Sequence, residues 1–215
     1  MKLANIHYII FVLFIVTFSK IEAQWEQTNG PYCGDVGSLF INDKKIYATT
    51  LQGGKFFSTN NGDTWLPLRS QIPGVITIFN NSLYVGNLNG IFISTDNGGD
   101  WNKINSGLAN ITTMEIQDSV LFVGTQFGLY WSRNFGYNSW ESAGLGEIPV
   151  SSIAVKDSLL FIGTYESGVY RFSSSDSNWI NLGLEYNYIS SIQLSNDVVF
   201  VGSFENGVFY SINYG

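Results

Sequence analysis

The chain has 215 residues, of which 45% are hydrophobic, 16% aromatic and only 13% charged, and its formal net charge is −7. This composition excludes an intrinsically disordered chain, which would carry many charges and few aromatic side chains. The single cysteine, Cys33, excludes an internal disulfide and a CxxC redox pair.

The first 23 residues have the three parts of a secretory signal peptide. Lys2 supplies a positive charge, an apolar run extends from Tyr8 to Phe18, and the small residue Ala23 precedes the predicted cleavage point. A helix of that apolar run rises about 16 Å, roughly half of what a bilayer core requires, so a lasting membrane span is not expected. Cleavage also removes His7, the only histidine, which excludes Ser-His-Asp and Cys-His catalysis and histidine zinc sites in the mature chain.

The mature chain is predicted to comprise residues 24–215, with 8 basic and 16 acidic residues and a net charge of −8. We expect it to be secreted, periplasmic or exposed at the cell surface, without stable membrane insertion once the signal peptide is removed. Its acidic balance makes nucleic acids and anionic membranes poor partners.

Two sequence markers recur through the mature chain with a period of about 39 residues, which indicates a repeat architecture. Tryptophans follow one another at intervals of 36 to 40 residues, at Trp25, Trp65, Trp101, Trp140 and Trp179. The second marker is a short β-type segment, typically Phe-x-Gly-Thr, which begins with an aromatic residue and recurs in step with the tryptophans. Its copies are Tyr47–Thr50, Tyr84–Asn87, Phe122–Thr125, Phe161–Thr164 and Phe200–Ser203.

Within one repeat the hydrophobic period is two, which is typical of β-strands. In the repeat Ile111–Gly144, short β-rich runs are divided by turns rich in Gly, Asn, Asp and Ser, and they predict a four-stranded antiparallel meander. No stretch of the mature chain has the period of an amphipathic helix. A repeated four-stranded sheet of about 40 residues predicts an all-β protein with the fold of a β-propeller.

A third marker, Ser-x-Asn/Asp-x-Gly, precedes the tryptophans. Its predicted residues are Ser58, Asn60, Gly62 and Trp65; Ser94, Asp96, Gly98 and Trp101; Ser132, Asn134, Gly136 and Trp140; Asp176 and Trp179; and Ser211, Asn213 and Gly215. The copies at Ser58 and Ser94 closely resemble the Asp-box of bacterial neuraminidase (BNR) repeats. The third has an extra residue before its tryptophan, and the fourth lacks the glycine.

The Asp-box resemblance covers roughly residues 25–215 and implies a fold rather than a function. Sialidases, sortilin-type ectodomains, xyloglucanase-type glucanases and photosystem II assembly-factor-like propellers share this box. The blades also share a linking pattern that is most similar to that of secreted bacterial repeat proteins. In chain order it consists of Gly-Leu, a β-strand, Phe-x-Gly-Thr and Gly-Val-Tyr.

The box residues suit a structural hairpin corner. Glycine can take the positive φ that a turn needs, Asn or Asp accepts hydrogen bonds from nearby backbone N–H groups, and tryptophan packs between sheets. A calcium loop at Asp96–Asp100 is the alternative, but this segment lacks the alternating ligands and the distal glutamate of such loops. We therefore expect no metal and no cofactor.

The two ends of the chain complement each other in the repeat register. Trp25 begins a fourth strand without the preceding three, whereas Ile189–Asn213 supplies three strands without a fourth. Gln24 and Trp25 are therefore predicted to complete the last blade and to close a ring of about five blades. The alternative is that the 215 residues are a piece of a longer propeller.

In a propeller meander, the links between blades and the turns between second and third strands share one face, opposite the boxes. Sialidases, which the chain resembles in its boxes, keep their chemistry on that opposite face. Its aromatic rings, amides and carboxylates suit a peptide or a neutral or cationic sugar, although ordinary loop residues are the simpler interpretation. The predicted ligand-binding residues are Tyr32, Phe127, Tyr165, Glu166, Phe204 and Glu205, within a wider set that includes Glu185, Tyr186 and Tyr188.

Enzymatic activity is the minority hypothesis. A sialidase needs three arginines around a carboxylate, but Arg133 and Arg171 fall in or beside boxes, on the wrong face. A glycoside hydrolase could use two carboxylates, for example Glu166 and Glu205. We predict no catalytic residue and an exported, non-catalytic binding or assembly scaffold for a protein or a surface glycan; the alternative is a carbohydrate-active hydrolase. Trp131 is interpreted as a packing residue.

Overall fold

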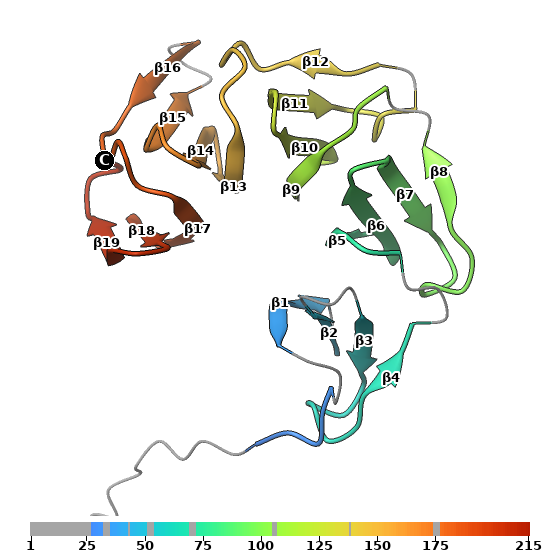
Figure 1. The fold of residues 1–215 in the computed structure, drawn as a ribbon. Helices are drawn as coiled ribbons and strands as arrows, with labels where there is room; N and C mark the ends of the chain where they lie inside the picture. Colours follow the sequence, from blue (N-terminus) through green and yellow to red (C-terminus); the bar gives the residue numbers. More distant parts are fainter. Residues whose placement is uncertain are drawn as a thin grey trace, which may run out of the picture.

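The computed structural model describes residues 27–31, 35–42, 44–50, 54–68, 72–104, 107–137, 139–173 and 177–215. These residues form strands β1 to β19 in five antiparallel sheets, and no helix. Figure 1 shows the sheets following one another around a common axis, as the blades of a propeller. The predicted all-β fold, a β-propeller of five blades, is confirmed. The predicted signal peptide, residues 1–23, lies outside the described residues.

Each blade is a meander of strands in chain order. Blade 1 comprises β1 (Val36–Asn42), β2 (Lys45–Thr50), β3 (Lys55–Ser58) and β4 (Leu66–Pro67), and blade 2 comprises β5 (Val75–Phe79), β6 (Ser82–Asn87), β7 (Gly90–Ser94) and β8 (Asn102–Ile104). Blade 3 comprises β9 (Ile111–Gln117), β10 (Val120–Thr125), β11 (Gly128–Ser132) and β12 (Glu141–Ser142), and blade 4 comprises β13 (Val150–Lys156), β14 (Leu159–Thr164), β15 (Val169–Ser173) and β16 (Asn178–Asn181). Blade 5 comprises β17 (Ile189–Ser195), β18 (Val198–Ser203) and β19 (Gly207–Ser211).

The hydrophobic core lies between successive blades rather than inside one sheet. Between blades 4 and 5, for example, Phe161 of β14 and Ile189 of β17 are both fully buried in one cluster with Val201. Because a strand presents alternate residues to opposite faces, each blade offers one apolar set to the blade before it and another to the blade after it.

The glycine of the Phe-x-Gly-Thr segment allows this close packing. A Cβ atom at Gly163 would stand 2.3 Å from Cγ2 of Ile189, and one at Gly124 would stand 2.8 Å from Cγ1 of Val150. Gly86 meets Ile111 in the same way, at 2.5 Å. The repeated glycine is therefore the place where the first strand of the next blade rests on the second strand of the blade before it.

The two end blades expose apolar positions that the inner blades bury. Val208 of β19 is 73% exposed, whereas its counterparts Ile91 and Leu129 are 0% and 1% exposed. Leu39 of β1 is 61% exposed, and its counterpart Ile76 is 2% exposed. Figure 1 shows the arc of blades open between these two ends.

The predicted closure of the ring depends on Gln24 and Trp25, which lie outside the described residues. The described part of the same segment reaches blade 1, because the side chain of Thr28 packs against Gly62. Leu68 packs against Gly98 in the same manner, and Leu182 packs against Gly215. Leu68 and Leu182 directly follow the fourth strands of blades 1 and 4 and pack on the corner of the next blade. Thr28 packs on the corner of blade 1 in the same way.

A hydrogen-bonded corner joins the third and fourth strands. In blade 2, Ser94 Oγ donates to Asp96 Oδ1 over 2.7 Å and accepts from the backbone N–H of Gly98 over 2.8 Å. The carboxylate of Asp96 also accepts from the N–H of Asp100, and these hydrogen bonds lower its pKa. Blades 1, 3 and 5 repeat the serine bonds at Ser58, Ser132 and Ser211.

The tryptophans lie closer to these corners than the sequence predicts. The repeat register that places Trp25 at the start of a fourth strand predicts the same for the later tryptophans, but Trp65, Trp101 and Trp140 immediately precede β4, β8 and β12, and only Trp179 lies within its strand. The reason is the contact between ring and corner, because the indole of Trp140 covers Gly136, where a Cβ would stand 2.4 Å from Cζ2. In blade 4, Asp176 lies outside the described residues, and Trp179 Nε1 donates to the carbonyl of Ala143 over 2.7 Å.

Replacing Ser94 with alanine is expected to lower the free energy of unfolding by about 2 kcal/mol, because the buried N–H of Gly98 loses its acceptor. The matched control is Ser211→Ala, since the equivalent Gly215 is exposed and water can replace the serine oxygen. Urea unfolding of both variants measures the difference. Equal losses at the two corners would contradict a role of burial.

Within the described residues, the chain forms no helix that is long and apolar enough to cross a membrane.

Candidate ligand-binding surface

Three stacked aromatic rings connect blades 4 and 5 on the face opposite the corners, which we call the link face. Tyr165 lies in the turn between β14 and β15, Tyr188 in the link before β17, and Phe204 in the turn between β18 and β19. The ring centroids of Tyr165 and Tyr188 are 4.8 Å apart, and those of Tyr188 and Phe204 are 5.6 Å apart. We call these three residues the aromatic surface.

The backbone holds the loops of the aromatic surface together. The N–H of Phe204 donates to the carbonyl of Tyr188 over 2.9 Å, and the N–H of Tyr165 donates to the carbonyl of Pro149 over 3.3 Å. Each bond joins a turn between second and third strands to the residue that precedes the first strand of the same blade. The rings are therefore placed by the repeat itself, because equivalent loops of neighbouring blades are brought side by side.

Asn187 joins its own link to the turn between β18 and β19. Its Nδ2 donates to the carbonyls of Leu184 and Glu185, within its own link. Its Oδ1 accepts from Asn206 Nδ2 over 2.7 Å and from Ser203 Oγ over 3.3 Å. One amide thus fixes the link that carries Tyr188 to the turn that carries the third ring.

The link before β17 runs close to the turn before β15, as the link before β13 runs close to the turn before β11. A Cβ at Gly168 would stand 2.1 Å from the carbonyl oxygen of Gly183, so only glycine fits there. Further along the link, Tyr186 has a φ of +65° and is 95% exposed, and its N–H donates to the carbonyl of Glu166. A tyrosine held in this left-handed conformation, with its ring in water, favours a role in binding over a role in packing.

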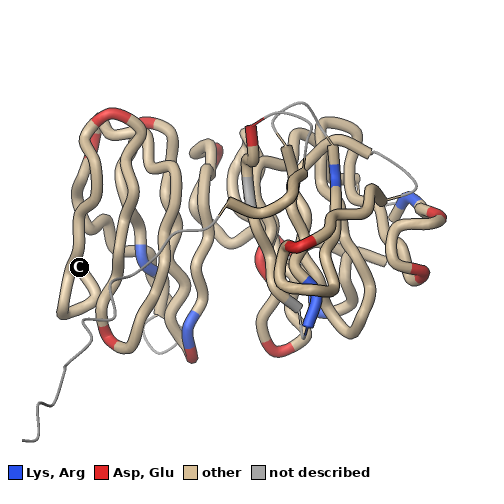
Figure 2. Tube along the Cα trace, turned by 90° about the horizontal axis from the view of Figure 1, so that it is seen from below, with Lys and Arg blue, Asp and Glu red and all other residues tan. Residues whose placement is uncertain are grey.

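The aromatic surface combines buried and exposed parts. Burial raises the pKa of Tyr165, and the neighbouring Tyr188 adds to the increase, so the phenol stays neutral at physiological pH. Phe204 is 73% exposed and Tyr188 is 40% exposed, which leaves ring faces open to a ligand. The exposed carboxylates Glu166 and Glu205 follow two of the rings directly in sequence. Figure 2 shows acidic positions at loop tips at both ends of the sheets.

The structure brings together only some of the residues predicted to bind a ligand. Tyr165 and Phe204 stack through Tyr188, which the narrower prediction left out although the link face was expected to display it. Phe127 is 54% exposed in the turn between β10 and β11 of blade 3, and it is not part of the stack. Tyr32 lies outside the described residues.

The sequence feature that could have predicted Tyr188 as part of the aromatic surface is its position in the repeat. It precedes β17 directly, as Asn110 precedes β9 and Pro149 precedes β13, so it stands where each link meets the turn of its own blade. Within the described residues, no group of three or more His, Cys, Asp or Glu side chains is arranged to hold a metal ion. The chemistry available at this surface is ring stacking, hydrogen bonding and attraction to neutral or cationic groups.

No protein-family model matches the chain, and no curated protein matches it significantly. Several solved structures are similar. The extracellular domain of a putative one-component system from B. thetaiotaomicron has a TM-score of 0.70 and 19% identity over 86% of this chain and 28% of that chain. YCF48 from Cyanidioschyzon merolae has a TM-score of 0.66 and 14% identity over 88% of this chain and 70% of that chain.

Enzymes are also among the similar structures. The GH74 enzyme of Niastella koreensis has a TM-score of 0.58 and 17% identity over 80% of this chain and 28% of that chain. The chain spans 57% of the length of the computationally designed Ika8 protein, which it also matches. At these identities the likeness shows a shared propeller fold, and the fold alone.

Proposed function

We propose that this protein is an exported, non-catalytic β-propeller that binds a protein or surface glycan through the aromatic surface. The observation that carries the proposal is the continuous stack of Tyr165, Tyr188 and Phe204 across two blades. A row of rings fixed by backbone bonds binds an extended ligand at low entropic cost, because its loops are already ordered.

The similar structures, the sequence markers and the charges near the rings also support the proposal. One similar structure is YCF48 bound to D1 peptide, at 12% identity and a TM-score of 0.61, and another is a nidogen/laminin complex. The Asp-box resemblance of the corners and the basic, apolar N-terminus favour an exported propeller of the BNR type. Glu166 and Glu205, which follow Tyr165 and Phe204 in sequence, and Glu185 of the link that carries Tyr188 favour a neutral or cationic partner over an anionic one.

Replacing Tyr188 with alanine is expected to weaken ligand binding at least tenfold, because it removes the central ring and separates the other two. The measurement is isothermal titration calorimetry with a panel of neutral oligosaccharides and of short peptides containing aromatic and basic residues. Phe127→Ala is the matched control, since Phe127 is an exposed ring of the same face outside the stack. If both variants bind as the parent does, or if neither ligand class binds the parent, the aromatic surface is not the binding site.

The alternative function is a glycoside hydrolase with Glu166 and Glu205 as its two carboxylates. Both are exposed and hold matching positions in the turns of successive blades, and GH74 enzymes share the fold. The double variant Glu166→Gln, Glu205→Gln separates the two functions. Loss of oligosaccharide cleavage with retained binding would establish the hydrolase, whereas binding without cleavage by the parent chain would establish the scaffold.

A further inference from the structure

The corners of blades 1, 2, 3 and 5 each have one residue in the left-handed conformation directly before the corner glycine. This residue is Asn61, Asn97, Phe135 and Tyr214, with φ values of +57°, +59°, +56° and +66°. Because the serine hydrogen bonds are the same at these four corners, the side chain starts from the same place, beside the gap between its own blade and the preceding blade.

An aromatic ring fills this place at two of the blade boundaries. Between blades 2 and 3, Phe135 lies 5.5 Å from Tyr84 and 5.1 Å from Phe79, measured between ring centroids. Between blades 4 and 5, Tyr214 lies 6.2 Å from Phe161. Tyr84 and Phe161 occupy matching positions of the second strand, so each ring packs on the equivalent aromatic residue of the preceding blade.

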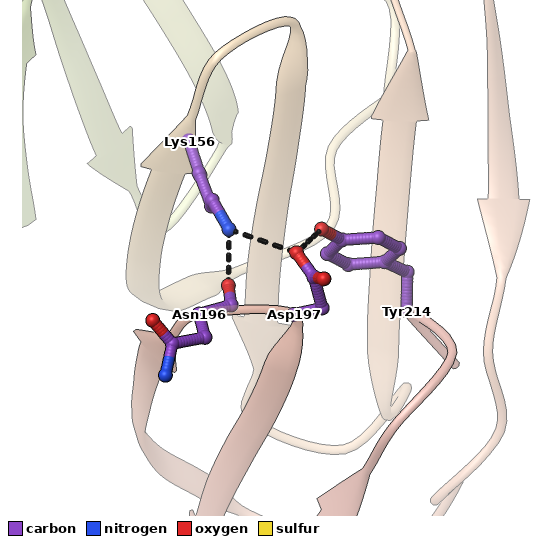
Figure 3. Close-up of polar contacts among 4 residues, drawn as sticks. All are labelled: Lys156, Asn196, Asp197 and Tyr214. Atoms are coloured by element: carbon purple, nitrogen blue, oxygen red, sulfur yellow. Dashed lines mark hydrogen bonds and ion pairs between the residues drawn. The ribbon is translucent and has the colours of Figure 1, made fainter.

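The ring of Tyr214 is also held by its hydroxyl group. Its O–H donates to Asp197 Oδ1 over 2.6 Å, and Lys156 forms an ion pair of 3.2 Å with the same carboxylate oxygen. Lys156 also donates to the backbone carbonyl of Asn196. Figure 3 shows the phenol directed toward this turn between the first two strands of blade 5. The boundary thus contains an apolar place for a ring and a polar turn for its hydroxyl.

Between blades 3 and 4 the hairpin of blade 4 is shorter, because its third and fourth strands pair as far as Ser173 and Asn178, and the sequence between these two residues contains no aromatic residue. At this boundary the structure contains a cavity of about 640 Å³, within the size range of small-molecule sites. Four aromatic rings line it, from Phe122, Trp131, Phe172 and Trp179. Phe122 is the counterpart of Tyr84 and Phe161, the two residues on which corner rings pack elsewhere.

The polar groups of the cavity lie where a phenol hydroxyl needs them. Asp157 and Ser158 line it, and they hold in blade 4 the turn positions of Asn196 and Asp197 in blade 5. Arg133 covers one side of Trp131, with Cζ 4.9 Å from the ring centroid, and Glu141 also lines the cavity. Trp131, interpreted from the sequence as a packing residue, is thus part of a cavity wall.

We propose that the cavity between blades 3 and 4 binds a phenolic ring from a ligand, in the place that Phe135 and Tyr214 fill at the neighbouring boundaries. The ring packs between Phe122, Trp131 and Trp179, and its hydroxyl reaches the turn of Asp157 and Ser158. A free phenol and the tyrosine side chain of a partner protein share this chemistry. The site lies on the corner face and is separate from the aromatic surface.

The test uses 4-methylphenol as the probe in isothermal titration calorimetry of the mature chain. We expect binding at least tenfold tighter than that of toluene, which lacks the hydroxyl. Trp131→Ala is expected to weaken 4-methylphenol binding at least tenfold, because it removes one of the rings that enclose the phenol. Phe127→Ala, which removes an exposed ring that does not line the cavity, is the matched control and is expected to bind as the parent does.

Three results would overturn the proposal: no binding of 4-methylphenol by the parent chain, equal binding of toluene, or unchanged binding by Trp131→Ala. The tripeptide Gly-Tyr-Gly distinguishes the sources of the ring. Binding of the tripeptide as tight as that of 4-methylphenol assigns the site to a partner's tyrosine, and much weaker binding assigns it to a free phenol. Tyr188→Ala is expected to leave this titration unchanged, so failure here is separable from failure of the proposed function.

Discussion

Replacing Gly163 with valine is expected to lower the free energy of unfolding by about 3 kcal/mol, the upper end of the usual cost of overpacking a core. Gly163 lies in β14, and a Cβ there would stand 2.3 Å from Ile189 Cγ2 and 2.5 Å from Ser152 Oγ. Both neighbours are buried, so neither has free space into which to move. The φ of Gly163 is not positive, which means that the effect is steric and not conformational.

Urea unfolding followed by circular dichroism measures this loss. Gln193→Val is the control, because it adds the same side chain at an exposed position of β17, where we expect a change below about 0.5 kcal/mol. If Gly163→Val unfolds at the urea concentration of the parent chain, the blades do not rest on this glycine.

Replacing Lys55 with methionine is expected to raise the free energy of unfolding at pH 7 by about 2 kcal/mol, because the folded chain no longer buries a cation. Lys55 is 1% exposed, and its counterparts in the register of the other blades are Ile91, Leu129, Val169 and Val208. Its ammonium group donates to the carbonyl of Ile72. Burial nevertheless lowers the pKa of Lys55 from 10.5 to about 8.

The lowered pKa of Lys55 makes stability depend on pH. Between pH 8 and pH 10.5 the unfolded chain retains the lysine proton while the folded chain has lost it, so the free energy of unfolding increases as the pH rises. From pH 8 to pH 9.5 Lys55 contributes an increase of about 1.5 kcal/mol. Glu115, whose pKa burial raises to about 7, is mostly ionised in both states in that window.

Urea unfolding at pH 8 and pH 9.5 measures this dependence in the parent chain and in Lys55→Met. The variant is expected to lose the increase, whereas Lys103→Met, at an exposed position of β8, is expected to keep it. An increase that persists in Lys55→Met would mean that another group titrates on folding, and the assignment to Lys55 would be wrong.

The sequence predicts part of the aromatic surface because the repeat gives each loop a face. Tyr165 and Phe204 follow the Phe-x-Gly-Thr segments of two successive blades, so the repeat register alone assigns both of them to one face. The repeat register does not predict which of these rings are in contact. Phe127 holds a similar turn in blade 3 and remains apart, whereas the link before β17 is bent by residues of positive φ, and that bend sets Tyr188 between the two predicted rings.

The cavity between blades 3 and 4 has no counterpart in the sequence predictions. The hairpin of blade 4 is a divergent copy of the corner, in which the pairing of the third and fourth strands extends to Ser173 and Asn178. The sequence shows Trp131 and Trp179 as two of many aromatic residues. That their rings border a cavity depends on which residues of blades 3 and 4 lie next to each other in space.

The sequence by itself determined the propeller: alternating apolar residues, turn residues at fixed offsets and a period of about 39 residues specify blades that must pack against one another. It also determined which loops share a face, because antiparallel strands return each turn to the same end. Only the tertiary structure decided which rings stack, where a cavity remains and that Lys55 occupies a buried position. These depend on contacts between residues of different blades, and hydrophobic burial is non-directional, so the pattern that specifies the blades does not specify their pairwise contacts.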